Sequence, residues 1–381
     1  MRFAEYIDEW HKYALSDFAT RITRRNKNNE SSLPLTISAQ YGLVDQITFF
    51  NKTVASVDLS GYYLLYNGDF AYNKSYSNDY AWGAVKRLDK YEKGCLSSLY
   101  FVFHPTDKVD SDYLTHYFET SKWHKGISDI AGEGARNHGL LNMAVDDYFA
   151  TKHYLPSLSE QKKIACFLNL ITKRIEIQNK IISDLKVLKK ELCNKVFSKG
   201  SAVRLGDFIE EVTTRNKSNS CENVLSVSNK MGFIKQSEQF EDRTVASENK
   251  SNYKVVTEGC FAYNPARINV GSIALLSTQI GIISPMYVCF KAKSALDSEY
   301  LNFYYQSGFF YKELQKKLEG SVRQCLTYEN MSEILIPYVG IEEQKAIAAT
   351  LNKFATLIAN EEKYLKSLQK QKSYFLNAMF I

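Results

Sequence analysis

The sequence predicts an α+β protein with two mixed, strand-rich globular domains and two long helices that pair as an antiparallel coiled coil with pseudo-two-fold symmetry. Three observations predict this fold. A long helical segment occurs twice, weaker matches precede both copies in the same order, and short β-branched and aromatic runs fill the regions between them. A chain of 381 residues is long enough to form two independent cores.

The repeated segment runs from residue 160 to 197 and again from 343 to 380, and the two copies are identical at 13 of 38 aligned positions. Each copy has an apolar residue every three or four positions, a pattern typical of a helix that packs against another helix rather than against a globular core. At 1.5 Å per residue, each helix would be about 57 Å long. Ser157 with Glu160, and Gly340 with Glu343, stand where a capping box would begin each helix.

The predicted seam is interrupted by polar residues at two matched steps, Gln178 with Glu361 and Lys189 with Lys372. Polar residues in a seam lower stability but fix the register. We therefore expect the two helices to pair with each other, with Gln178 and Glu361 near the centre of the pair. The pairing positions are Ile164, Leu168, Ile175, Gln178 and Leu185 in the first helix, and Ile347, Leu351, Ile358, Glu361 and Leu368 in the second.

Fainter matches extend the duplication into the globular regions. LSDF at residues 15–18 matches LGDF at 205–208, GDFAYN at 68–73 matches GCFAYN at 259–264, and DSDYL at 110–114 matches DSEYL at 297–301. The chain is therefore two tandem units, each a variable domain followed by a long helix. We place the domains at residues 1–153 and 200–335, and the helical segments at residues 154–199 and 336–381.

Composition narrows the functional classes. The net charge of +6 is uneven, because Lys and Arg outnumber Asp and Glu by 11 to 4 between residues 151 and 200. Bulk charge alone therefore does not predict nucleic-acid binding, which needs local basic clusters. The seven cysteines have no metal-site spacing, so we expect reduced thiols and no metal. No apolar run is long enough to span a membrane and no signal peptide is apparent, so we expect a cytoplasmic protein.

Local clusters of basic and amide residues recur at matched places in the two units. Arg and Lys suit phosphate contacts or bidentate reading of guanine, and Asn suits adenine. The candidate DNA-binding residues are Arg24, Arg25, Asn26, Lys27, Lys74, Tyr76, Arg136 and Asn137 in the first unit, and Arg215, Asn216, Lys217, Arg267, Arg323 and Gln324 in the second. Any one of these charges is more often a solvated side chain or a phosphate contact than a base reader. The FAYN segments equally fit strand ends packed into a core.

A proline-containing turn, then EQKKIA or EQKAIA, then a long helix, all of it twice and each time after a variable domain, resembles the specificity subunit of a type I DNA restriction-modification system. This resemblance covers nearly the whole chain. It implies two target recognition domains that read the halves of a bipartite, asymmetric DNA site, and helices that set their spacing and dock two methyltransferase subunits. Motor-nuclease subunits would join for restriction. S-adenosylmethionine, ATP and Mg²⁺ would be bound by the partner subunits, with no cofactor on this non-catalytic chain.

Two other functional classes remain open. The segment Asn264 to Arg267 is the nearest approach to an amino-methyltransferase motif, but it lacks the second proline and the aromatic residue that stacks on a flipped base. No glycine-rich loop follows the dinucleotide-binding or P-loop pattern. A DNA-modifying enzyme that acts alone would bind a methyl donor by itself. A coiled-coil scaffold would cause no sequence-selective shift of DNA.

Overall fold

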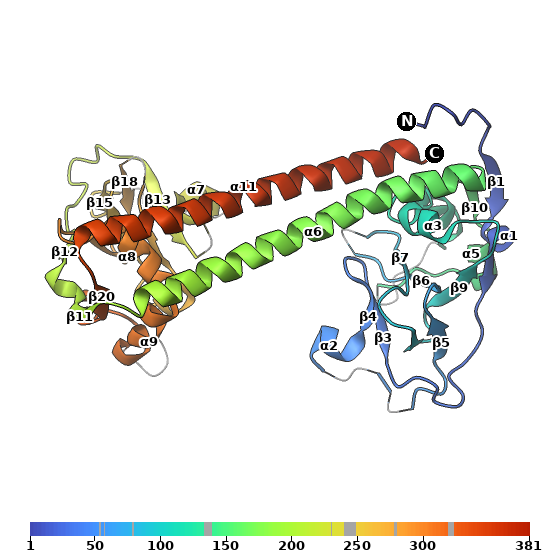
Figure 1. The fold of residues 1–381 in the computed structure, drawn as a ribbon, viewed down its shortest axis with the longest axis horizontal. Coiled ribbons are helices and arrows are strands. Elements are labelled where there is room, and N and C mark those ends of the chain that lie inside the picture. The colour runs from blue at the N-terminus through green and yellow to red at the C-terminus, as the bar shows by residue number, and fades with distance from the viewer. Residues whose placement is uncertain are drawn as a thin grey trace. The chain divides into compact units, whose positions relative to one another are not determined.

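The computed structural model describes residues 1–52, 55–56, 58–77, 80–132, 139–229, 231–239, 249–277, 280–318 and 324–381. These residues form two compact units (Figure 1). Unit 1 comprises Met1–Gln178 and Tyr364–Ile381, and unit 2 comprises Asn179–Lys363. Each unit thus contains one globular domain and one segment from each long helix. No helix among the described residues combines the length and the apolar character that a membrane span requires.

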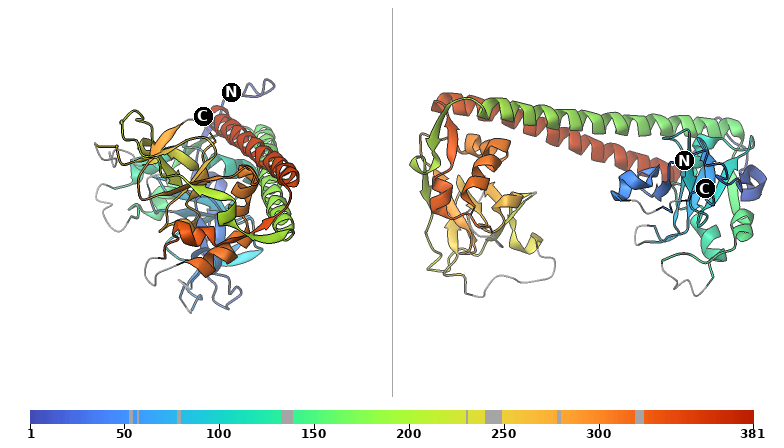
Figure 2. Two further views of the ribbon diagram at one scale, coloured as in Figure 1. Left: turned by 90° about the vertical axis from the view of Figure 1, so that its left-hand side faces the viewer. Right: turned by 90° about the horizontal axis from the view of Figure 1, so that it is seen from below.

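Both predicted helices are present (Figures 1 and 2). The first, α6, extends over Leu158–Phe197, and the second, α11, over Ile341–Met379, with 40 and 39 residues. The start of α6 only partly follows the expected capping box. The Ser157 Oγ accepts from the Glu160 N–H at 3.5 Å, while the buried Glu160 carboxylate receives two bonds from Arg2, at 2.6 and 2.7 Å.

In the part that the structure describes, the domain of unit 1 is built on a four-stranded antiparallel sheet of order β2-β9-β6-β7, accompanied by three strand pairs and five short helices. The sheet strands are β2 (Ala19–Arg21), β9 (Phe101–Pro105), β6 (Phe70–Asn73) and β7 (Ala84–Arg87). The pairs are β1 (His11–Ala14) with β10 (Lys152–Leu155), β3 (Leu35–Ser38) with β4 (Gly42–Asp45), and β5 (Tyr63–Tyr66) with β8 (Lys93–Leu96). The helices are α1 (Leu15–Phe18), α2 (Gln46–Phe50), α3 (Ser111–Tyr117), α4 (His124–Ile130) and α5 (Val145–Ala150).

The domain of unit 2 repeats this plan with a sheet of order β12-β19-β16-β17. These strands are β12 (Ile209–Glu211), β19 (Val288–Ala292), β16 (Cys260–Tyr263) and β17 (Ile273–Leu275). A second sheet has the order β14 (Gly232–Lys235), β13 (Val224–Ser228), β18 (Gly281–Ile283) and β15 (Lys254–Val256), and β11 (Ser201–Arg204) pairs with β20 (Leu335–Tyr338). The helices are α7 (Gln236–Gln239), α8 (Ser298–Tyr305), α9 (Gly308–Lys317) and α10 (Tyr328–Ser332), with 3-10 turns η1 (Leu205–Asp207) and η2 (Ile268–Val270).

The two FAYN segments are central strands with their aromatic side chains in the core, as the structural alternative for this motif predicted. Phe70 pairs with Phe103 in unit 1, and their rings stack with centroids 5.4 Å apart. In unit 2, Phe261 pairs with Phe290, with centroids 5.1 Å apart. This shared register lets positions of the two domains be equated residue by residue.

The glutamine of each EQK motif joins a long helix to its domain. The buried Gln161 accepts from the Asp110 N–H at 2.8 Å, and the buried Gln344 accepts from the Asp297 N–H at 2.8 Å. Asp110 and Asp297 are the N-caps of α3 and α8, so each glutamine fixes a domain helix to the beginning of a long helix. Strands β10 and β20 come just before α6 and α11 in the chain and belong to the same junctions. Residues 153 and 335, where we placed the ends of the two domains, lie in these strands.

The expectation that the helices pack only against each other is wrong near their ends. Ile164 and Leu168 of α6 lie in the hydrophobic core of unit 1, and Leu351 of α11 lies in the core of unit 2. The lysine interruptions also contact the domains rather than set a helix register. The Lys372 ammonium lies 2.9 Å from the Glu119 carboxylate, and the Lys189 ammonium lies 3.4 Å from the Gln306 side-chain oxygen.

The helices also contact each other within the units. In unit 1, the rings of Phe167 and Phe375 meet edge to face with centroids 4.9 Å apart, and Arg174 donates a hydrogen bond to the Tyr364 hydroxyl. Of the other pairing positions, Ile358 and Leu368 are buried, as is Gln178, whereas Ile175, Leu185, Ile347 and Glu361 are half-buried.

Candidate nucleic-acid interface

A loop of the same construction follows β2 in unit 1 and β12 in unit 2. The buried Asn26 side chain donates to the Ser31 carbonyl at 2.9 Å and accepts from the Ser31 N–H at 3.1 Å. Asn216 makes the same two bonds to Cys221, at 3.0 and 3.2 Å. Burial removes both amides from solvent and the loop uses their hydrogen-bonding groups, so this structure does not present Asn26 and Asn216 for the predicted contact with adenine.

The arginines before these asparagines attach the loops to the chain segments that lead into β5 and β15. Arg25 donates to the Gly61 carbonyl at 2.7 Å, with its guanidinium 4.2 Å from the centroid of the Tyr63 ring. Arg215 donates to the Asn252 carbonyl at 2.7 Å. A guanidinium has five N–H donors, so each arginine keeps donors for a ligand. Lys27 and Lys217 follow the buried asparagines and are exposed, as phosphate contacts require.

Arg24 belongs to a cluster that the sequence did not indicate. Its guanidinium forms an ion pair with the buried Asp69 and lies 4.4 Å from the centroid of the Tyr66 ring. The other Asp69 oxygen lies 2.8 Å from Nδ1 of His104, whose side chain is 57% exposed. Asp69 thus orients one arginine and one histidine at the domain surface. The acidic residue of the GDFAYN segment was the one sequence signal for this cluster. It did not indicate His104, which lies 35 residues further along the chain.

Unit 2 has different side chains at the positions of this cluster. Strand register equates Asp69 with Cys260, because each precedes the phenylalanine of FAYN, and equates His104 with Lys291. Counting back from the matched arginines equates Arg24 with Thr214. An acid, a histidine and an arginine in one frame are therefore replaced by a thiol, a lysine and a hydroxyl in the other. The two domains present different chemistry from one backbone plan.

The loops after the FAYN strands also share a turn and differ in their side chains. The Asn73 side chain accepts from the Ser75 N–H at 2.9 Å, and that of Asn264 accepts from the Ala266 N–H at 3.0 Å. These Asx turns project different residues. In unit 1 the turn projects Lys74 and the exposed Tyr76, and the Lys74 ammonium lies 4.7 Å from the centroid of the Phe101 ring. In unit 2 the turn projects the exposed Arg267. Burial lowers the pKa of Lys74.

A second segment lies beside each of these loops. The Leu141 N–H donates to the Lys74 carbonyl at 3.0 Å, and the Leu326 N–H donates to the Pro265 carbonyl at 3.2 Å. Gln324 is exposed near the second of these contacts. The remaining predicted residues Arg136, Asn137 and Arg323 lie outside the described residues. Across the described ranges, no three His, Cys, Asp or Glu side chains are grouped to hold a metal ion.

Comparisons with known proteins agree with this architecture. Residues 199–370 match the family model for the type I restriction modification DNA specificity domain. The type I restriction enzyme MjaVIII specificity subunit of Methanocaldococcus jannaschii is 25% identical over 322 residues, which cover 76% of this chain and 74% of that protein. The putative type I restriction enzyme MjaX specificity subunit of the same organism is 26% identical over 295 residues, covering 72% and 68%.

The fold also resembles a solved structure. The S subunit of a type I restriction-modification system from M. genitalium is 14% identical and has a TM-score of 0.58, with 100% of this chain and 98% of that chain covered. At this identity the likeness concerns the fold, which has mixed domains and long helices in both proteins. Residues 199–370 thus match the type I restriction modification DNA specificity domain, and the chain is similar over about three quarters of its length to type I restriction enzyme specificity subunits.

Proposed function

We propose that this chain reads a bipartite, asymmetric DNA site, with one half recognised by each globular domain. The observation that carries the proposal is that the two domains share a strand register and a hydrogen-bonded loop but carry unlike surface residues. The buried Asn26 and Asn216 hold their loops with the same hydrogen bonds. At the positions of Arg24 and His104, however, unit 2 has Thr214 and Lys291. Equivalent scaffolds with different donors and acceptors are what two readers of unlike half-sites need.

The long helices would hold the two readers apart. We propose that α6 and α11 pair as an antiparallel coiled coil with pseudo-two-fold symmetry. Contacts in unit 1 support the antiparallel direction. Phe167 of α6 contacts Phe375 of α11, and Arg174, later in α6, contacts Tyr364, which lies earlier in α11. In unit 2, Lys186 pairs with Glu362 at 2.7 Å. An antiparallel arrangement places tandem domains at opposite ends of the helices.

The partners follow from the family. We propose that two methyltransferase subunits dock on the chain and methylate adenine, and that motor-nuclease subunits join for restriction in the cytoplasm. S-adenosylmethionine, ATP and Mg²⁺ would then be held by those subunits, and this chain would be non-catalytic. The segment around Asn264 agrees with that assignment, because the amide oxygen of Asn264 accepts from the Ala266 N–H at 3.0 Å and organises a turn.

The test is to exchange residues 1–150 for those of a relative and to map methylated bases by long-read sequencing. We expect one half of the methylated motif to change, while the other half and the spacer length stay the same. A change in both halves would show that the domains read DNA jointly. Methyl transfer by the purified chain alone would favour a self-sufficient enzyme, and loss of sequence-selective DNA binding in the assembled complex would favour a scaffold.

A further inference from the structure

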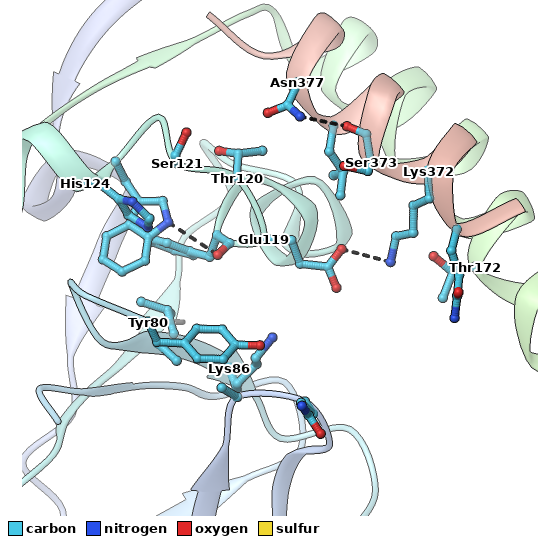
Figure 3. A pocket seen from close by; sticks show the side chains of 18 of the residues that line it. Tyr80, Lys86, Glu119, Thr120, Ser121, His124, Thr172, Lys372, Ser373 and Asn377 are labelled. Carbon is cyan, nitrogen blue, oxygen red and sulfur yellow. Dashed lines mark hydrogen bonds and ion pairs between the residues drawn. The ribbon is translucent and has the colours of Figure 1, made fainter. Parts of the chain in front are cut away.

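A cavity of unit 1 is distinct from the loops described above. Its volume is 690 Å³. Its walls come from β7, from the segment between α3 and the start of α4, from α6, and from the end of α11. Figure 3 shows Lys86 and Tyr80 on one side, His124 on another, and the Glu119 carboxylate directed to Lys372. The volume lies within the range of small-molecule sites.

Lys86 is the unusual group in this cavity. Its side chain is half-buried, and among the described residues its ammonium makes no hydrogen bond or ion pair. The nearby Glu119 carboxylate is already paired with Lys372 at 2.9 Å. Burial lowers the pKa of Lys86, and the charge of Glu119 opposes that shift. A partly desolvated ammonium without a partner is unfavourable unless an anion neutralises it.

The same place in unit 2 shows that the fold does not require this charge. Lys86 pairs with Ala71 in the sheet, and the equivalent pair in unit 2 is Ala274 with Ala262. Glu119 follows α3 where Gln306 follows α8, and Lys189 contacts Gln306 as Lys372 contacts Glu119. The repeat therefore keeps the helix lysine but has neither Lys86 nor Glu119. The lysine of unit 1 is an addition to a frame that folds with alanine there.

We propose that this cavity binds a small organic phosphate of nucleoside monophosphate size, with the phosphate against Lys86 and the flat group beside Tyr80 and His124. A phosphate supplies the negative charge that the lysine lacks. The volume is far larger than one inorganic ion needs, and aromatic rings in the lining favour a planar ligand. Glu119 limits the affinity, because its charge opposes the phosphate.

The experiment measures binding of adenosine monophosphate to the full chain by calorimetry and by fluorescence, since Trp123 also lines the cavity. The variants place the unit 2 residues in unit 1. Lys86→Ala should weaken binding at least about tenfold, the effect of losing one charge-assisted contact. Glu119→Gln should tighten binding, because a repulsive charge is removed. Adenosine without the phosphate should bind at least about tenfold more weakly than the monophosphate.

Thermal unfolding keeps the result interpretable. Without ligand, Lys86→Ala should raise the Tm of unit 1, because an unpaired cation is removed from a site where alanine fits. A fall in Tm would mean that the protein itself satisfies Lys86, which overturns the proposal. So would absence of binding to the wild type, or equal binding by Lys86→Ala. Displacement of the monophosphate by duplex DNA but not by inorganic phosphate would assign the cavity to DNA instead. None of these outcomes depends on which bases the domains read.

Discussion

At the scale of single residues, the repeat separates side chains that build the frame from those that vary upon it. Asn26 and Asn216 looked like base readers because asparagine in a basic loop suits adenine. A sequence does not show whether an amide is buried, and burial is what assigns these two to the frame. The same limit hid the Asp69 cluster, since its members come together only through pairing of β6 with β9.

This division predicts opposite outcomes for neighbours in the chain. Asn26→Ala should lower the free energy of unfolding of unit 1 by about 2 to 4 kcal/mol, because the Ser31 N–H and carbonyl lose their buried partners. Lys27→Ala should leave stability within about 0.5 kcal/mol and weaken DNA binding by the complex. All three tryptophans, Trp10, Trp82 and Trp123, lie in unit 1, so their fluorescence follows the unfolding of that unit. A fall in the free energy of unfolding of Lys27→Ala as large as that of Asn26→Ala would contradict the assignment of Lys27 to DNA contact.

His153 supplies a pH dependence at the same scale. It is buried between the Tyr117 hydroxyl at 2.9 Å and the Thr151 hydroxyl at 2.8 Å, and burial lowers its pKa to about 4. As the pH falls from about 6.5 towards 4, the unfolded chain takes up a proton that the native ring does not. The free energy of unfolding should therefore fall by about 3 kcal/mol over this window.

The control is His153→Gln, which keeps polar contacts but does not titrate. Urea unfolding of unit 1, followed by tryptophan fluorescence at several pH values between 7 and 4, should show a shallower slope for this variant. Other groups titrate alike in both proteins, so the difference belongs to His153. Equal slopes would show that the native state accommodates the protonated ring.

At the scale of elements, the two long helices could be predicted because a regular apolar pattern over almost forty residues is a strong helical signal. Their contacts with the domains could not be predicted, because periodicity defines a face of a helix and not what covers it. Lys189 and Lys372 were therefore interpreted as register-setting residues of a helix pair, although they contact the domains. The EQK motif was recognised as a repeat, but its glutamine bond to the domain appears only in three dimensions.

That bond gives a prediction about the junction of domain and helix. Gln161→Ala should lower the free energy of unfolding of unit 1 by about 2 kcal/mol, since the Asp110 N–H and the Pro156 carbonyl lose a partner. Gln344→Ala is the matched change in unit 2 and should leave the tryptophan-detected transition unaltered. Circular dichroism of both variants should show unchanged helix content. Equal effects of the two variants on that transition would mean that the units unfold together.

At the scale of the whole molecule, the duplication itself was evident from the sequence, and the two units follow it with one difference. Each unit includes a segment of the other repeat's helix, so unit 1 closes with Tyr364–Ile381. The core of unit 1 accordingly includes Met379 and Phe380 from the end of the chain. A linear division into domain, helix, domain and helix could not show this exchange, because it arises from the packing of helix ends on distant domains.

The helices give the last prediction, which concerns spacing along DNA. Four residues inserted after Lys180 in α6 and after the equivalent Lys363 in α11 add about 6 Å of rise and keep the apolar face approximately in phase. Because one base-pair step is about 3.4 Å, the methylated half-sites should move apart by one or two base pairs with their sequences unchanged. Long-read sequencing of methylated bases measures both features in one experiment. One-residue insertions at the same places rotate the face by about 100° and should abolish assembly and methylation together. If the four-residue variant stays active with its original spacing, the distance between half-sites is set by the partner subunits and not by these helices.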